Sequence, residues 1–101
     1  MSDKNIEKTV LTGEQIKENL ELLMQDWVVE GGKLKLSIEL DDFITAVDSV
    51  NEIAEVAEEY NHHPSLHIHD YNVLDIELIT HSVSKLTKID FEVAKTIDLM
   101  F

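Results

Sequence analysis

The segment FITAVDSVNEIAEVAEEY occupies residues 43–60, and Asn61-His62-His63-Pro64 follows it directly. Apolar residues recur in this segment at the three- and four-residue spacing of a helix that buries one face. They are Phe43, Ala46, Val47, Val50, Ile53, Ala54, Ala57 and Tyr60. Asp41 or Asp42 is suited to cap the helix, and Pro64 prevents its continuation. The sequence therefore predicts one long helix that ends in a loop containing two adjacent histidines.

Strand-like alternation flanks this helix on both sides. Before it, Trp27-Val28-Val29 begins a short strand, and Gly31-Gly32 is a strong signal for a hairpin turn. Residues 34–40 then alternate between apolar and polar side chains, which is the period of a strand with one buried face. After the helix, two further strands are predicted at residues 66–69 and 72–80.

A helix is also predicted near each end of the chain. Thr12 and Gln15 have the spacing of a capping box, which predicts a helix over residues 13–25. Thr87 and Asp90 have the same spacing and predict a final helix. This capping role would by itself explain Asp90 without any catalytic function.

The predicted order is helix, two strands, helix, two strands, helix. Two hairpins separated by a long helix indicate an α+β fold, in which a four-stranded antiparallel sheet carries its helices on one face. We expect residues 1–11 to form a flexible N-terminal arm and residues 12–101 to form a single domain. A domain of this size buries only a modest core, and an open sheet edge tends to pair, so we also expect a homo-oligomer.

The chain has 101 residues, of which 21 are acidic and 8 are basic, and its formal net charge is −13. A negative field repels phosphate backbones, so direct binding to nucleic acid is not expected. No segment approaches the roughly 18 apolar residues that span a bilayer, so no membrane association is expected. The N-terminal residues have no apolar signal core, which predicts a cytoplasmic protein. Cysteine is absent, which excludes disulfides and thiolate chemistry.

All five histidines lie between residues 62 and 81. Imidazole exchanges protons readily near neutral pH, so several imidazoles in one cleft indicate proton transfer or metal binding. Each has a structural interpretation too: His62 could cap the long helix, His63 could be a turn residue, and His81 could be an exposed strand end. Because the loop and the strand end should meet at one sheet edge, we expect these three to share a cleft. We also expect His62 and His81 to be at least partly exposed.

His67 and His69 raise a separate alternative. Residues two apart on a strand point to the same side, so the pair could offer two nitrogens to a metal, with His81 or Asp70 as a third ligand. The spacing specifies no third ligand, and an ordinary surface strand is the favoured interpretation. No metal site is predicted.

The segment from residue 58 to 90, EEYNHHPSLHIHDYNVLDIELITHSVSKLTKID, resembles the signature of the pterin-4a-carbinolamine dehydratase family. The matching elements are Glu58, His62-His63-Pro64, Leu66, Tyr71-Asn72, Thr80-His81 and Asp90. The resemblance extends over roughly residues 12 to 100, with support from Trp27 and Asp42-Phe43. Many members of the family differ from this chain at three places. They have Trp in place of Leu66, and one residue fewer between that position and the equivalent of Tyr71. They also have a Gly pair in place of Ser84-Lys85. We therefore expect the loop after His81 to follow a different path.

The resemblance implies a four-stranded sheet with helices on one face, and oligomers that are dimers or tetramers. It also implies the activity of a 4a-hydroxytetrahydrobiopterin dehydratase, a lyase that works without a metal or organic cofactor. In the residue-by-residue match, His62, His63 and His81 would be catalytic, Asn61, Ile79 and Thr80 would contact the pterin, and Glu58 and Asp90 would support them. Domains of this kind also serve as non-catalytic binding or assembly proteins, which is the alternative function.

Overall fold

The sheet is built from two hairpins whose turns the local sequence dictates. β1 (Val28–Glu30) and β2 (Lys33–Glu39) are joined by Gly31-Gly32. Both glycines have positive φ, 60° and 77°, a backbone region that glycine adopts without steric cost. β3 (Ser65–His69) and β4 (Val73–Leu78) form the second hairpin.

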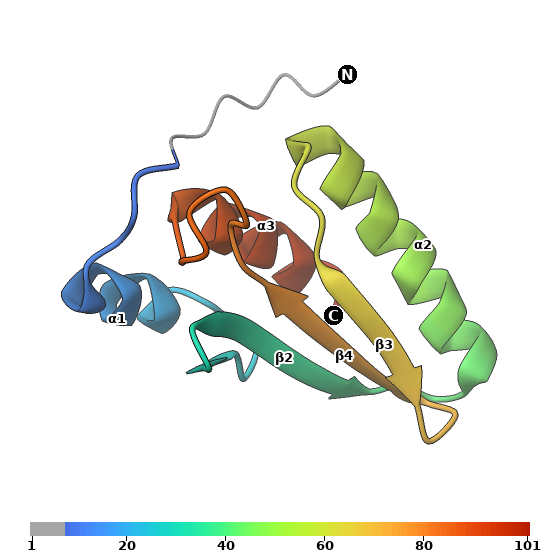
Figure 1. The fold of residues 1–101 in the computed structure, drawn as a ribbon. Helices are drawn as coiled ribbons and strands as arrows, with labels where there is room; N and C mark the ends of the chain where they lie inside the picture. The colour runs from blue at the N-terminus through green and yellow to red at the C-terminus, as the bar shows by residue number, and fades with distance from the viewer. Residues whose placement is uncertain (1–7) are drawn as a thin grey trace.

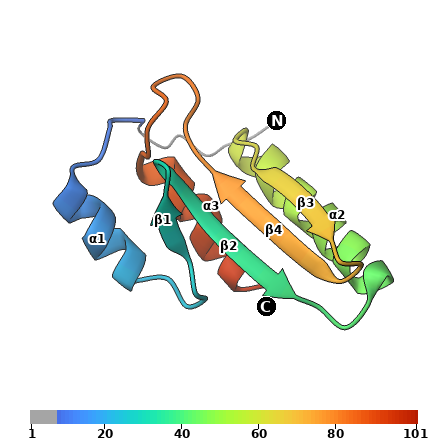
Figure 2. The same ribbon diagram turned by 60° about the horizontal axis from the view of Figure 1, so that its bottom comes forward.

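The two hairpins join through their inner strands into one antiparallel sheet of order β1-β2-β4-β3. The computed structural model describes residues 8–101, and in it α1 (Gly13–Glu21), α2 (Phe43–Tyr60) and α3 (Lys88–Asp98) pack on one face of the sheet (Figure 1). Figure 2 shows α3 behind the central strands and α2 beside β3. The predicted α+β order and the four-stranded antiparallel sheet are confirmed.

The core lies between the sheet and the helices. Most of it comes from the inward side chains of the two central strands and from α3, and α2 adds Ile53 and Tyr60. The fully buried members include Leu34, Leu74, Ile76, Leu78, Phe91, Val93, Ala94 and Ile97. The alternation of buried and less buried residues in β4 follows the period of two expected from the sequence. This core fixes β4 against α3, and the ends of these two elements carry part of the site described below.

The buried stripe of α2 is narrower than the sequence predicts. Ile53, Ala57 and Tyr60 are buried as expected, but Phe43 is 51% exposed and Ala54 is also exposed. The apolar positions of this helix cover a wider arc than its contacts with α3 and β3 can bury. Part of the predicted apolar face is therefore open to solvent.

The first helix ends earlier than predicted because of a contact distant in sequence. α1 ends at Glu21, and the chain beyond it turns so that Met24 N–H and Trp27 Nε1–H each donate to the Asp98 carboxylate at 2.7 Å. Asp98 is buried at the end of α3. A helix continued to residue 25 would not present these donors to Asp98.

Residues 1–7 of the predicted N-terminal arm lie outside the described residues. Of the remainder, Leu11 N–H donates to Leu86 O at 3.1 Å, and Val10 forms an antiparallel bridge with Thr87. This part of the arm therefore lies along the loop that leads from β4 to α3. Within residues 8–101, no helix has the length and apolar character needed to cross a membrane.

Candidate active site

The end of α2 positions the first two histidines. Asn61 adopts the left-handed conformation, with φ 51° and ψ 44°, which asparagine tolerates better than most residues and which ends the helix. The next N–H, that of His62, donates to Ala57 O at 3.0 Å. Pro64 then leads the chain into β3. Local sequence thus turns His62 and His63 away from the helix axis, at the edge of the sheet.

The structure brings His62, His63 and His81 together at one cavity of about 210 Å³. Asn61 and Thr80, both expected near the substrate, also line this cavity. Ile79 does not line it. Ile79 follows the inward-facing Leu78, so the alternation of a strand directs it to the other side.

Two cavity residues were not found from the sequence: Lys8 and Ser82. No motif marks either of them. Lys8 reaches the cavity because Val10, two residues later, pairs with Thr87. That contact joins opposite ends of the chain, and no local pattern predicts it.

A buried carboxylate holds His62 in place. Asp90 is fully buried and accepts three hydrogen bonds: from His62 Nε2 at 2.6 Å, Thr80 Oγ1 at 2.7 Å and the Thr87 backbone N–H at 2.9 Å. Three donors on one carboxyl group match the acceptor-only character of its ionised form. The Thr87–Asp90 capping box expected from the sequence is formed, and the same carboxylate also orients an imidazole.

The expectation that His62 is partly exposed is wrong. Its side chain is only 7% exposed because its Nε2 must reach Asp90, which lies inside the first turn of α3. The bond to Asp90 places a proton on Nε2, so the neutral ring carries its lone pair on Nδ1. The structure therefore fixes both the orientation and the tautomer of this histidine.

The other two histidines are held less firmly. His63 Nε2 bonds to Glu58 Oε2, and both side chains are more than half exposed. His81 is exposed, as expected, and its side chain forms no hydrogen bond with any described residue. The cavity thus combines one fixed imidazole, one loosely paired imidazole and one free imidazole.

The loop after His81 closes without glycine. Ser84 adopts φ 52°, the left-handed conformation expected of a Gly, and Thr80 N–H donates to Lys85 O at 3.1 Å. A serine in this conformation costs more than a glycine but less than a β-branched residue. The turn is therefore made at the serine of the Ser84-Lys85 pair.

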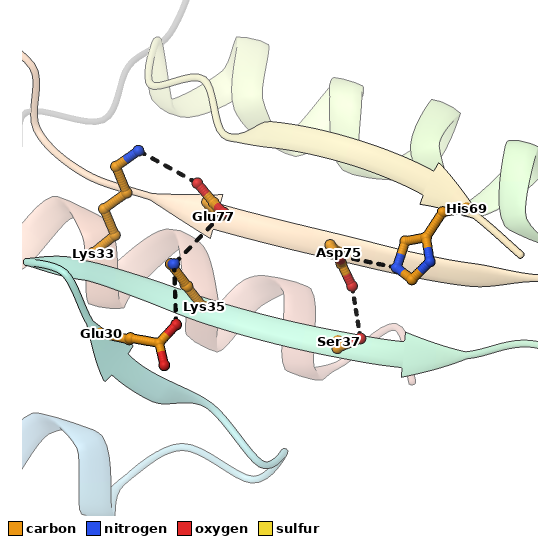
Figure 3. A network of polar contacts seen from close by, with 7 residues as sticks. All are labelled: Glu30, Lys33, Lys35, Ser37, His69, Asp75 and Glu77. Carbon is orange, nitrogen blue, oxygen red and sulfur yellow. Dashed lines mark hydrogen bonds and ion pairs between the residues drawn. The ribbon is translucent and has the colours of Figure 1, made fainter.

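His67 and His69 lie on the same side of β3, as the spacing predicts, with ring centroids 5.1 Å apart. They do not line the three-histidine cavity. His69 donates from Nδ1 to Asp70 and from Nε2 to Asp75, each at 3.0 Å, and Ser37 Oγ donates to Asp75 at 2.6 Å. Figure 3 shows the contacts of Asp75 with His69 and Ser37, on the face of the sheet opposite the helices. Among residues 8–101, no three such ligands are grouped as a metal site requires.

Only a protonated imidazole can donate from both ring nitrogens. Hydrogen bonds to Asp70 and then to Asp75 accordingly hold the pKa of the His69 imidazole above its ordinary value. The hydrogen bond from Ser37, followed by that from His69, holds the pKa of the Asp75 carboxyl below its ordinary value. The protonated His69 therefore helps to hold β3 against β4 through Asp75.

The fold and cavity together define a class of small α+β domain in which imidazoles that follow a helix and a central strand meet at one end of the sheet. The sequence matches the family described as pterin 4 alpha carbinolamine dehydratase over residues 9–100. The chain belongs to this family.

Curated relatives agree with this assignment. A protein from Nostoc punctiforme is 42% identical over 88 residues, which cover 87% of this chain and 92% of that protein. One from Mycobacterium bovis is 40% identical over 92 residues, which cover 91% of this chain and 96% of that protein. Both are named provisionally as pterin-4-alpha-carbinolamine dehydratases.

Solved structures show the same fold. The transcriptional coactivator/pterin dehydratase from Brucella melitensis superposes with a TM-score of 0.83 at 29% identity, over 91% of this chain and 98% of that one. A pterin dehydratase-like protein identified as a RuBisCO assembly factor in the alpha-carboxysome has a TM-score of 0.61 at 16% identity, over 73% and 87% of the two chains. The second likeness concerns the fold alone.

The His69 network predicts a pH-dependent stability. Because the folded-state pKa of His69 lies above that of the unfolded chain, its stabilising effect is complete below about pH 6.5 and is lost as pH rises through the folded-state pKa. His69→Gln should therefore destabilise the protein more at about pH 6 than at about pH 9, as measured by urea unfolding. His67→Gln is the matched control. An equal loss at both pH values for His69→Gln would contradict this interpretation.

Proposed function

We propose that the protein dehydrates 4a-hydroxytetrahydropterins to quinonoid dihydropterins by general acid–base catalysis. The observation that carries this proposal is the buried Asp90–His62 pair, which presents an imidazole of fixed tautomer to a cavity shared with two further histidines. Membership of the family supports the choice of substrate class.

The reaction requires two proton transfers. The C4a–O bond breaks and the hydroxyl group must leave as water, because hydroxide is a poor leaving group. The adjacent ring nitrogen loses its proton as the C4a=N double bond forms. One acid and one base near neutral pH satisfy this balance, and imidazole serves in either role. Imidazoles supply both transfers, so the proposed reaction calls on no metal or organic cofactor.

We assign the base to His62 and the acid to His81. With the Nε2 proton of His62 directed at Asp90, Nδ1 is the nitrogen that can accept a proton from the substrate. His81 has no described side-chain partner and is exposed, so it can exchange its proton with solvent between turnovers. His63, paired with Glu58, is proposed to assist the departure of water, and Asn61 and Thr80 to contact the pterin ring.

A second candidate function is a non-catalytic binding or assembly protein. The named roles of the two similar structures, one a transcriptional coactivator/pterin dehydratase and the other a RuBisCO assembly factor, favour this alternative. A protein that only binds a partner has no need of an imidazole held in one tautomer. Absence of dehydration by the intact protein would therefore favour this second function.

Histidine variants test the proposed roles. His81→Ala should lower the dehydration rate about 10²- to 10⁴-fold with little change in stability, because its side chain is exposed and has no described partner. His62→Ala should lower the rate similarly and also destabilise the fold by about 1–3 kcal/mol, since Asp90 loses a buried partner. The measurements are stopped-flow decay of the 4a-carbinolamine and urea unfolding.

His67→Ala and His69→Ala are the controls, and both should retain nearly the wild-type dehydration rate. The effects of His62→Ala and His81→Ala should be less than additive if both imidazoles act in one coupled transfer. Loss of activity in the controls, with His62→Ala and His81→Ala near the wild type, would contradict the assignment.

We also propose that the protein is a homodimer or homotetramer. β1 and β3 are the outer strands of the sheet, and outer strands are prone to pair with another chain unless they are covered. On α2, Phe43 is 51% exposed and Ile44 is 66% exposed. Light scattering should report a dimer or tetramer at micromolar concentration, whereas a stable monomer would contradict this proposal. Ile44→Asp should weaken the assembly if this end of α2 lies in the interface.

A further inference from the structure

The N-terminal segment brings a cation to the three-histidine cavity. Lys8 lines the cavity together with His62, His63 and His81. It is the one lysine among the described residues of the lining. The chain has 21 acidic and only 8 basic residues, so a charged residue at a given position is more often negative than positive.

Backbone pairing brings Lys8 to the cavity. Val10, two residues after Lys8, forms an antiparallel bridge with Thr87. Thr87 in turn lies against Thr80, with their Oγ1 atoms 2.8 Å apart. Thr80 lines the cavity, so this bridge holds the N-terminal segment beside the cavity at the point where Lys8 lies.

No carboxylate among residues 8–101 neutralises the Lys8 ammonium. It forms no hydrogen bond or ion pair with any described residue, whereas Lys33, Lys35 and Lys95 each pair with a glutamate. The exposed carboxylate of Glu58 is bonded to His63. The Lys8 charge is thus available to a ligand in the cavity.

We propose that Lys8 is a substrate-binding residue of this site and donates a charge-assisted hydrogen bond to an oxygen acceptor of the pterin. This inference rests on the proposed function. The acceptor is either the ring carbonyl beside C4a or an anionic group on the ring substituent. Both are oxygen acceptors for an ammonium group, and such bonds are shorter and stronger than those between neutral groups. Lys8 is the one described side chain of this lining whose polar group is always a hydrogen-bond donor, since Asn61, Ser82, Thr80 and the imidazoles can each also accept.

Binding of two unreactive, fluorescent pterins tests the inference. 6-Methylpterin carries the ring carbonyl alone, and pterin-6-carboxylate adds an anionic substituent. Lys8→Met should raise the Kd of at least one of them by about three- to tenfold, as expected for one partly exposed charged hydrogen bond. A rise for both identifies the ring carbonyl as the acceptor, and a rise for pterin-6-carboxylate alone identifies the substituent.

Two further variants control for charge and geometry. Lys17→Met removes the same charge from the exposed face of α1 and should change either Kd by less than about twofold. Lys8→Arg keeps the cation and should retain most of the affinity. Equal Kd values for Lys8→Met and Lys17→Met with both pterins would overturn the inference, as would a wild-type protein that binds neither.

The outcome for Lys8 is separable from that for the proposed function. If the wild type dehydrates the carbinolamine but Lys8→Met binds both pterins normally, only the role of Lys8 is overturned. If the wild type binds pterins with the Lys8 dependence but does not dehydrate them, the role of Lys8 stands and the proposed dehydration fails.

Discussion

The buried carboxylate of Asp90 is the constraint on which the rest of this site depends. It accepts hydrogen bonds from His62 in the loop after α2, from Thr80 after the end of β4, and from Thr87 at the start of α3. His62 lies 28 residues before Asp90, whereas Thr80 and Thr87 lie 10 and 3 residues before it. A buried polar group without a hydrogen-bond partner costs about 1–3 kcal/mol of stability. Asp90 can therefore be buried at little cost only if all three donors reach its carboxylate. The arrangement that completes the fold here is also the one that orients the imidazole.

The five histidines lie in two places and have different contacts. His62, His63 and His81 line the cavity, and His67 and His69 lie on the open face of the sheet. At one end of the sheet, the three cavity histidines differ in how firmly they are held, which suits the proposed reaction with one oriented base and one exchangeable acid. On the open face, His69 bridges two carboxylates and links the strands of the second hairpin to β2 through Asp75 and Ser37 (Figure 3). All five histidines lie close together in the sequence. In the structure, His67 and His69 lie along β3, whereas the other three lie at the cavity.

Periodicity and turn chemistry were sufficient to predict the order of helices and strands, because those signals are local. Asn61, Pro64 and the Gly31-Gly32 turn mark element ends without reference to any other part of the chain. The early end of α1 and the burial of His62 were missed because each depends on a distant carboxylate, Asp98 in one case and Asp90 in the other. Lys8 was missed for the same reason: its position follows from a bridge to Thr87 at the opposite end of the chain. For His62, the capping-box aspartate was visible in the sequence, but nothing local showed that it would bind an imidazole as well as a backbone N–H.

The most direct test of this account is the dehydration rate of Asp90→Asn, measured per folded molecule alongside its unfolding free energy. Asparagine is nearly isosteric but has one acceptor oxygen in place of two. Because the Thr87 N–H can only donate, that oxygen stays with Thr87 and the NH₂ group faces His62 Nε2. His62 would then have to accept at Nε2 and carry its proton on Nδ1. The account predicts a rate about 10²- to 10⁴-fold below that of the wild type, at a pH and temperature where the variant remains folded. A folded Asp90→Asn protein that dehydrates the carbinolamine at the wild-type rate would contradict the claim that this carboxylate sets the chemistry of His62.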